Sequence, residues 1–358
     1  MNRESELILV INPGSTSTKA ALFCGSRKIS SVLLEHTAEE LAQYSDVLAQ
    51  KDFRKEAVLG YLQQEGVLLA DLAAIAARCG AVVPLESGAY LVNERLIEAV
   101  KNSDAPHPAN LAPIIAYEFC CEAGGDLTAY IYDGVSCMGT PEEIYQITGI
   151  EDFEKPFYTH VLNSKAVAWE QARREGAGPE DRNYIVAHLG GGITVNLLQG
   201  GRIIDFVGDD EGAFSPERSG GLPVRRLVDL CYSGKYTREQ MQKLLKGRGG
   251  FMSYLGTNDS REVERRIEDG DEKARLIYEA MALQISKDIA SLTAVVSGKV
   301  DRIILTGGMA HSKALIEKIR MRVGFLAPIA VLAGTFEMEA LAGGILRVLR
   351  GEEEYRFL

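Results

Sequence analysis

The sequence has few cysteines, no long hydrophobic run and no excess of positive charge. Its six cysteines show no Cys-x-x-Cys spacing, so we expect reduced thiols packed as small apolar groups, with no cysteine-ligated metal site and no disulfide scaffold. The longest apolar stretch, residues 323–336, is interrupted by Pro328 and is too short to span a bilayer. The first residues predict a short strand and a turn, not a signal peptide. The sequence therefore predicts a cytoplasmic protein that does not insert in membranes.

The charge balance limits the partners. The formal net charge of −11 argues against a general nucleic-acid or anionic-membrane binder. If the ligand is an anion, cationic side chains have to be gathered locally against the overall field. Individual arginines near glycine-rich turns therefore carry more information here than in a basic protein.

Length and pattern predict two α/β domains. A chain of 358 residues exceeds one comfortable hydrophobic core, and apolar strand-like runs alternate with segments of helical spacing. A polar segment over residues 147–158 is typical of a crossover between domains. We expect an N-terminal domain over residues 1–160, completed by a C-terminal helix at 337–358, and a second domain over 161–336.

An internal similarity supports a duplication. With Gly14 aligned to Gly190, "LVINPGSTSTKAA" lies over "IVAHLGGGITVNL". Both read as an apolar strand, a glycine-bearing turn and a second strand, and "RIILTGGMAHSKALIEKI" is a related strand, turn and helix.

Such turns suit an anion. A strand that ends at a glycine exposes backbone N–H groups near one point, and hydroxyl side chains add neutral donors. One such turn is about as well explained as a plain tight turn, but three together indicate phosphate-binding loops. Neither GxGxxG in the first turn nor GxxxxGK[ST] anywhere is present, so the scheme is neither a Rossmann nor a Walker A loop.

Four segments, "INPGSTSTK", "HLGGGITV", "DDEGAFSPERSGGLP" and "LTGGMAHS", together resemble butyrate kinases. These belong with acetate kinases in the sugar kinase, heat-shock chaperone and actin superfamily, and the likeness extends to the ending "GTFEMEALAGGILRVL". The resemblance implies two duplicated ribonuclease-H-like (actin-like ATPase) domains with mixed sheets flanked by helices, and an interdomain cleft. It also implies ATP and ADP as co-substrates, Mg²⁺, and a homodimer or larger homo-oligomer.

The resemblance also assigns residues. It implies four catalytic residues, Arg78, Asp133, His160 and Arg218, and two metal-associated carboxylates, Asp133 and Glu337. The implied nucleotide- and phosphate-binding residues are Asn12, Gly14, Ser15, Thr16, Ser17, Lys19, His188, Gly190, Gly191, Gly192, Asp259, Arg261, Gly307 and Gly308.

The sequence departs from the family pattern around the acceptor. No acidic residue closely follows Asp133, and "RCGAVV" lacks the Gly-Gly that normally follows the first active-site arginine. The family usually has Glu-His before "SNL" or "ANL", where this chain has "PHPANL". Gly80 stands where acetate kinases tend to carry a bulkier apolar residue. A missing side chain there predicts room for a longer acyl tail, of about four carbons, at about 0.8 kcal/mol per buried methylene.

The implied reaction fits these residue types. A carboxylate is already ionised at neutral pH, so phosphoryl transfer from ATP needs no strong base. It needs positioning, cations on the transferred group and carboxylates around Mg²⁺. The predicted reaction is ATP plus butyrate, or a branched short-chain acid, giving ADP plus acyl phosphate. An acetate- or propionate-type kinase, a catalytically silent ATP-binding regulator and a kinase for a sugar hydroxyl remain alternatives.

Each residue also has a structural interpretation. Asn12, Asp133 and Arg218 could serve ordinary turns, and His160 could be a satisfied structural histidine. Asp259 is better explained as a helix N-cap, and Glu337 could favour a helix dipole. For Asp259 the N-cap role and the nucleotide-binding role can coexist, because helix N-termini commonly lie near nucleotides.

Overall fold

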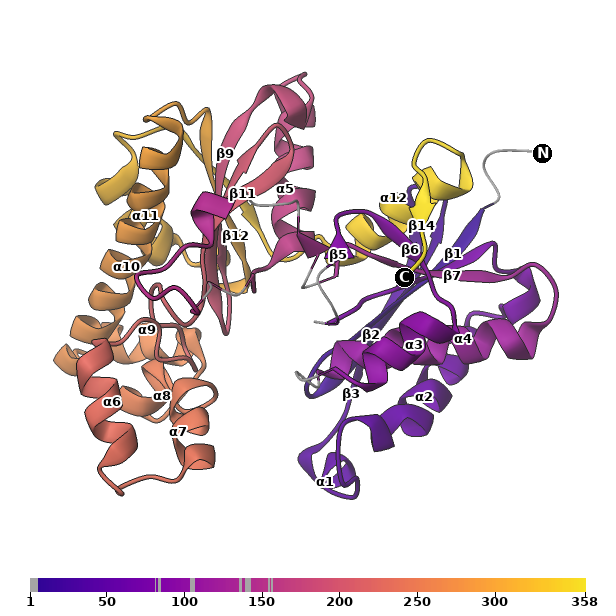
Figure 1. Ribbon diagram of the computed structural model, residues 1–358, viewed down its shortest axis with the longest axis horizontal. Coiled ribbons are helices and arrows are strands. Elements are labelled where there is room, and N and C mark those ends of the chain that lie inside the picture. The colour runs from indigo at the N-terminus through magenta and orange to yellow at the C-terminus, as the bar shows by residue number, and fades with distance from the viewer. Residues whose placement is uncertain are drawn as a thin grey trace. The chain divides into compact units, whose positions relative to one another are not determined.

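The computed structural model describes residues 6–80, 82, 85–103, 107–134, 137–138, 143–153, 155 and 157–358. The chain divides into two compact units, Met1–Gly139 with Phe336–Leu358, and Thr140–Thr335 (Figure 1). The division falls at Gly139 and not at residue 160, because the segment before residue 160 packs on the second unit. Phe157 lies edge-on to Phe206 at 4.8 Å between ring centroids, and Thr159 Oγ1 donates to Asn196 Oδ1 at 2.6 Å.

The first unit is built on a seven-stranded mixed sheet in the order β14-β6-β7-β4-β1-β2-β3. Its strands are β1 (Leu7–Pro13), β2 (Ser17–Cys24), β3 (Arg27–Glu35), β4 (Ala74–Ala77), β6 (Ala89–Leu91), β7 (Thr128–Tyr132) and β14 (Tyr355–Arg356). A separate two-stranded sheet joins β5 (Leu85–Glu86) to β8 (Cys137–Met138). The helices are α1 (Ala38–Leu41), α2 (Lys51–Gln64), α3 (Glu94–Lys101), α4 (Leu111–Ala123) and α12 (Glu337–Leu349).

The second unit has a five-stranded mixed sheet in the order β11-β10-β9-β12-β13. Its strands are β9 (Asn183–Leu189), β10 (Ile193–Gln199), β11 (Arg202–Val207), β12 (Arg302–Gly307) and β13 (Ile329–Ala333). The helices are α5 (Val161–Arg174), α6 (Val224–Tyr232), α7 (Arg238–Leu245), α8 (Gly250–Leu255), α9 (Ser260–Glu268), α10 (Glu272–Thr293) and α11 (Lys313–Val323).

The two sheets repeat one topology. Strands β3-β2-β1-β4-β7 of the first correspond in order to β11-β10-β9-β12-β13 of the second. In each, three antiparallel strands are followed by two parallel ones. The similarity between the segments around Gly14 and Gly190 thus belongs to equivalent hairpins, β1–β2 and β9–β10.

The central strands of the first unit are buried on both faces, which explains their continuous apolar sequence. Leu9 and Ile11 of β1 share one core with residues of α2 and α4, while α12 packs on β1, β4 and β7. A Cβ on Gly344 of α12 would lie 2.5 Å from the ring of Tyr132. The glycine therefore permits the close approach of α12 to the sheet (Figure 1).

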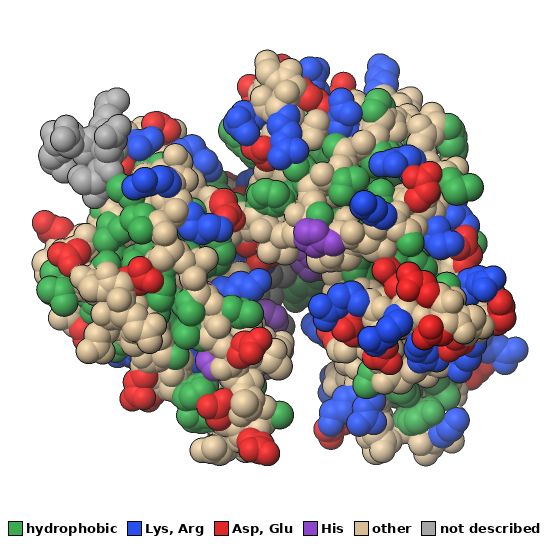
Figure 2. Space-filling view, turned by 180° about the vertical axis from the view of Figure 1, so that it is seen from behind, with side chains coloured by type: hydrophobic (Ala, Val, Ile, Leu, Met, Phe, Trp, Pro, Cys, Tyr) green, Lys and Arg blue, Asp and Glu red, His purple; other side chains and the backbone are tan. Residues whose placement is uncertain are grey.

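The core of the second unit joins its sheet to the long helix α10, at the left in Figure 1. Met281 and Ile285 of α10, four residues apart and so on one face of the helix, are fully buried in this core. Among the described residues, no helix combines the length and apolar character that crossing a membrane requires. On the face drawn in Figure 2, Lys and Arg side chains are interspersed with Asp and Glu.

Candidate functional site

In the first unit, three predicted residues meet at the start of α12. The Nδ2 of Asn12, at the end of β1, donates to Glu337 Oε2 at 2.9 Å. The guanidinium of Arg78, which follows β4, lies with Nη2 3.9 Å from Glu337 Oε1 and donates from Nη1 to the carbonyl of Cys79 at 3.0 Å. Strands β1 and β4 are parallel neighbours, so their carboxyl ends bring Asn12 and Arg78 to the same edge of the sheet.

The β1–β2 turn places its residues on two sides. Asn12 pairs with Lys19 across the hairpin, and directly paired residues share a face of a sheet, so Lys19 lies on the Asn12 side. Ser15 and Thr16 are exposed at the tip, and Thr18 is buried. The Gly14 N–H donates to the Ser17 carbonyl at 2.7 Å, which closes the turn.

Asp133 follows β7 in an unusual backbone conformation. It is one of two non-glycine residues in the described part of the chain with positive φ, at 42°, and only 1 % of its surface is exposed. Its Oδ1 accepts from the hydroxyl of Ser87 at 2.6 Å and from the N–H of Gly88 at 3.0 Å. A buried carboxylate held by two hydrogen bonds on a strained backbone is more typical of a functional site than of an ordinary turn.

The structure does not support the expected space beside Gly80. A Cβ at this position would lie 2.3 Å from Asn110 Oδ1 and 3.2 Å from the Cβ of His107. The Gly80 N–H instead donates to Asn110 Oδ1 at 3.0 Å. The volume is therefore filled by Asn110, the residue directly before α4, and the space that the sequence predicts beside Gly80 is not present.

In the second unit, the β9–β10 turn lies against Arg218. A Cβ on Gly192 would come within 2.5 Å of the Arg218 guanidinium carbon, and one on Gly191 would lie 3.3 Å from Glu217 Oε1. The glycines thus allow the Arg218 loop to lie directly on the turn. Arg218 forms an ion pair with Asp209, and its buried Nε has no hydrogen-bond acceptor in the structure described here.

The loop that carries Arg218 is tied to α10. The Ala213 N–H donates to Asp288 Oδ2 at 2.6 Å, and the Phe214 N–H donates to Gln284 Oε1 at 3.2 Å. Burial raises the pKa of Asp288 to about 6. Burial also lowers the pKa of Arg218, although a guanidinium stays charged at neutral pH.

His160 and His188 form a pair on the sheet face that α5 covers. Their rings stack with centroids 3.9 Å apart and planes inclined by 4°. His160 Nδ1 lies 2.9 Å from Thr194 Oγ1, and His188 Nδ1 lies 3.0 Å from Asn163 Nδ2. Because an amide nitrogen only donates, His188 Nδ1 accepts this hydrogen bond and its proton, in the neutral ring, is on Nε2.

The loop after β12 contains Gly307 and Gly308. Gly307 has φ of 89°, and a Cβ there would lie 2.3 Å from the carbonyl oxygen of Leu189. Only glycine allows this approach of β12 to the end of β9. Around Gly308 a Cβ would meet nothing within 4 Å.

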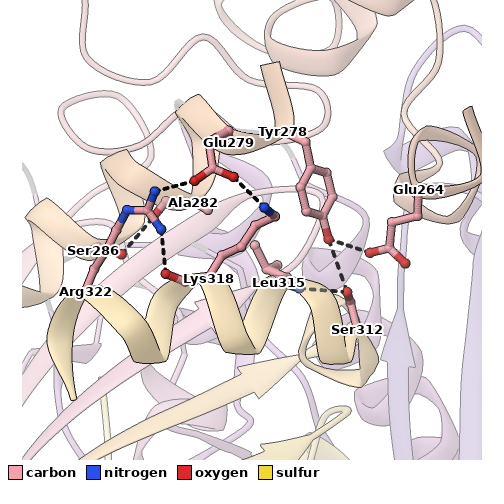
Figure 3. A network of polar contacts seen from close by, with 9 residues as sticks. All are labelled: Glu264, Tyr278, Glu279, Ala282, Ser286, Ser312, Leu315, Lys318 and Arg322. Atoms are coloured by element: carbon pink, nitrogen blue, oxygen red, sulfur yellow. Dashed lines mark hydrogen bonds and ion pairs between the residues drawn. The ribbon is translucent and has the colours of Figure 1, made fainter. Parts of the chain in front are cut away.

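A polar network beneath this loop joins three helices (Figure 3). The Tyr278 hydroxyl of α10 contacts Glu264 of α9 and lies 3.1 Å from Ser312 Oγ. Ser312 in turn caps α11 by accepting from the Leu315 N–H at 3.0 Å. Glu279 binds both Lys318 and Arg322 of α11. The network fixes the start of α11 and therefore the loop that precedes it.

Asp259 and Arg261 pair with each other. Asp259 is the N-cap of α9, as predicted, and accepts from the Arg261 N–H at 2.9 Å. Its carboxylate also accepts from Arg261 Nε at 2.9 Å and Nη2 at 2.8 Å. These hydrogen bonds hold the pKa of Asp259 down at about 2. The neighbouring Asn258 reaches Glu217 Oε2 at 3.3 Å, which connects this helix start with the Arg218 loop.

Each unit therefore gathers part of the predicted set. The first holds Asn12, Arg78 and Glu337 together, and the second holds the glycine turns with Arg218 and the histidine pair. Within the described residues, no group of three or more His, Cys, Asp or Glu side chains could hold a metal ion. Of the residues that depart from the family pattern, 81, 83, 106, 135, 136, 139 and 140 lie outside the described part of the chain.

Residues 142–328 match the acetokinase family. Over 348 residues, 97 % of this chain and 98 % of its relative, the sequence is 46 % identical to a protein of Caldanaerobacter subterraneus named probable butyrate kinase 2. The chain belongs to the acetokinase family. The membership predicted from the glycine-turn motifs is confirmed, and with it the class of enzyme, a kinase whose acceptor is a carboxylate.

Two crystal structures show the same fold at low identity. A propionate kinase from Francisella tularensis has a TM-score of 0.78 and 20 % identity, with 95 % of this chain and 98 % of that chain covered. An acetate kinase from Porphyromonas gingivalis has a TM-score of 0.79 and 18 % identity, with 96 % and 100 % covered. The predicted fold class, duplicated α/β units with mixed sheets flanked by helices, is confirmed.

Sequence reasoning missed several polar residues that complete these groups. Asn110 fills the space beside Gly80, Asn163 orients His188, and Asp209 pairs with Arg218. The buried Arg54 contacts the β1–β2 turn from below. Each of these residues is distant in sequence from the residue that it contacts, or lies in a segment without a recognisable motif, so the contact is apparent only in the folded structure.

Proposed function

We propose that this kinase transfers the terminal phosphoryl group of ATP to butyrate, or to a branched acid of similar size. A carboxylate oxygen attacks the terminal phosphorus, the bond from that phosphorus to the oxygen of ADP breaks, and acyl phosphate and ADP result. No proton has to move, because the acid is ionised at neutral pH. The identity of 46 % with a relative named as a butyrate kinase carries the choice of acid. Because acyl phosphates are high-energy donors, the transfer is reversible.

Residues of the first unit would hold the acceptor side. Arg78 would neutralise the incoming carboxylate and the transferred group. The Asn12–Glu337 hydrogen bond would hold the Asn12 amide, and Gly14, Ser15, Thr16, Ser17 and Lys19 would supply donors to phosphate oxygens. The proposal rests on the convergence of Asn12, Arg78 and Glu337 at one sheet edge.

Residues of the second unit would hold ATP and the transferred group. The unpartnered buried Nε of Arg218 supports a role as donor to a phosphoryl oxygen, since buried donors normally have acceptors. His160 would contact the same group, beside His188. Gly190, Gly191, Gly192, Gly307 and Gly308 would lie along the phosphates, with Asp259 and Arg261 toward the base or ribose.

Mg²⁺ would be held by Asp133 and Glu337. Both offer carboxylate oxygens, the donors that Mg²⁺ prefers, and one or two carboxylates suffice because the ion keeps several waters. Asp133 is fixed by Ser87 and Gly88 through Oδ1, a fixed carboxylate of the kind such an ion requires. When bound, the ion would neutralise charge on the phosphates.

The setting of the enzyme is also part of the proposal. Since ATP and ADP are its nucleotides, we place it in the cytoplasm. We also propose a homodimer or larger homo-oligomer, which the resemblance to butyrate kinases implies.

Acyl phosphate formation tests the function directly. The protein is incubated with ATP, Mg²⁺ and each of a panel of two- to five-carbon acids, and product is trapped with hydroxylamine. We expect the highest kcat/KM with butyrate, isobutyrate or a branched five-carbon acid. A maximum at acetate or propionate would overturn the assignment of the acid. Absence of product with every acid, with ATP binding intact, would point to a regulator or another acceptor.

A further inference from the structure

Arg54 of α2 is a fully buried cation beneath the β1–β2 turn, with 0 % of its surface exposed. Its Nη1 donates to the carbonyls of Gly14 at 3.0 Å and Ser17 at 2.9 Å, and its Nη2 to that of Ser15 at 3.3 Å. Nη1 also contacts Thr18 Oγ1 at 3.0 Å. One guanidinium thus binds three carbonyls of the turn.

This arrangement sets the direction of the N–H groups in the turn. In a trans peptide the C=O of one residue and the N–H of the next point in opposite directions. The carbonyls of Gly14 and Ser15 face Arg54, so the N–H groups of Ser15 and Thr16 face away from it, at the exposed tip. No backbone carbonyl of the described chain accepts from either N–H. Successive N–H groups aimed to one side form an anion-binding concavity.

The charge of Arg54 is not balanced by an acid. Its remaining hydrogen bonds go from Nε and Nη2 to the neutral Oε1 of Gln50, at 3.1 and 2.9 Å. No Asp or Glu in the described part of the chain forms an ion pair with it. A buried cation normally requires an opposite charge, and a phosphate at the turn would supply one.

We infer that Arg54 is a positioning residue that holds the β1–β2 turn open for phosphate and adds its own buried positive charge beneath the bound anion. This rests on the proposed function, in which the turn contacts the phosphates of ATP. The phosphate site then includes a residue of α2 that lies behind the turn and does not touch the ligand.

The charge is tested by Gln50→Glu. A glutamate side chain has the length of glutamine and can accept the same two hydrogen bonds, so the turn keeps its support while the positive charge is neutralised locally. We expect the Kd of MgATP, measured by calorimetry, to rise on the order of tenfold, with Tm unchanged or higher. The Kd of AMP, which lacks the outer phosphates, stays the same. Gln63→Glu, an exposed position of the same helix, adds the same charge and is expected to change neither Kd.

The fork geometry is tested by Arg54→Lys, which keeps the charge but replaces the planar five-donor group by one ammonium. We expect weaker binding of MgATP than in wild type, again without an effect on AMP. If Gln50→Glu binds MgATP as wild type does, the charge of Arg54 plays no part. If Arg54→Lys binds it as wild type does, the fork is not required. Should Arg54→Lys not fold, the result with Gln50→Glu decides the inference.

These binding measurements are separate from the acyl phosphate assay. A wild-type protein that phosphorylates no acid, but whose MgATP affinity falls tenfold in Gln50→Glu, would end the proposed function and leave the inference standing. Normal kinase activity with unchanged affinity in Gln50→Glu would do the reverse.

Discussion

Gly80→Ala tests whether the backbone after Arg78 is built around Asn110. The added Cβ would lie 2.3 Å from Asn110 Oδ1 and 3.2 Å from Asn110 Cγ. Asn110 has only 2 % of its surface exposed, so it cannot swing into solvent. The substitution should therefore break the hydrogen bond from Gly80 N–H to Asn110 Oδ1 and strain the packing.

The expected loss follows from these two effects. A buried hydrogen bond contributes about 1 kcal/mol, and overpacking costs about 1–3 kcal/mol. We expect a free energy of unfolding lower by about 3 kcal/mol, which lowers Tm by about 6–12 °C for a unit of this size. Gly60→Ala is the matched control, because a Cβ there meets nothing within 4 Å and alanine suits the interior of α2.

Thermal unfolding followed by circular dichroism measures this loss, and the acid panel is run on the same samples. Adding Asn110→Ala removes the clash, so the double variant should be more stable than the sum of the single changes predicts. An unchanged Tm together with a selective loss of activity toward the larger acids would refute this reasoning. That result would restore Gly80 as the wall of the acyl pocket.

Three further variants test the site and its support. Arg218→Ala is expected to lower kcat by a factor of about 10²–10³. The control Arg226→Ala, which removes an exposed arginine of α6, should leave kcat unchanged. A wild-type kcat in Arg218→Ala would show that Arg218 takes no part in the reaction. Asp133→Asn keeps an oxygen for Ser87 and Gly88, so Tm should hold while the Mg²⁺ concentration for half-maximal rate rises; an unchanged Mg²⁺ titration would exclude Asp133 from the metal. Burial raises the pKa of Asp288 to about 6, above the pKa of this group in the unfolded chain. Its contribution to the free energy of unfolding is therefore fully present below the unfolded pKa and is lost as pH rises through about 6. Asp288→Asn should remove about 1–2 kcal/mol of this pH dependence, and a Tm–pH curve identical to wild type would contradict it.

The strands around the glycine turns could be predicted from sequence because their signals are local. An apolar run ended by Asn-Pro-Gly and another ended by Gly-Gly-Gly match the ends of β1 and β9. Residues 37–66 have helical spacing throughout, which by itself favours one continuous helix, but the structure has α1, a short 3-10 turn at Leu48–Gln50, and α2. The Asp46 carboxylate accepts from the Ala49 N–H within that turn, a side-chain-to-backbone hydrogen bond that competes with a continuous helix and leaves no mark in the hydrophobic spacing.

The supporting residues of the site could not be predicted because their partners are distant in sequence. Arg54 reads as one charged residue on a polar helix, yet it binds carbonyls 37 to 40 residues earlier. Gly80 reads as a missing side chain, yet Asn110, 30 residues later, takes that volume. In both positions tertiary contacts reverse the interpretation that residue type alone suggests.

The return of α12 to the first unit has a consequence for synthesis. The second unit is continuous, Thr140–Thr335, whereas the first sheet waits for Glu337–Leu349 to cover β1, β4 and β7. On the ribosome, the half that emerges first is therefore completed last, after the other half has had its whole length available to fold. Until then Asn12 also lacks its hydrogen-bond partner Glu337, so a ribosome-bound chain arrested before residue 337 would lack this contact.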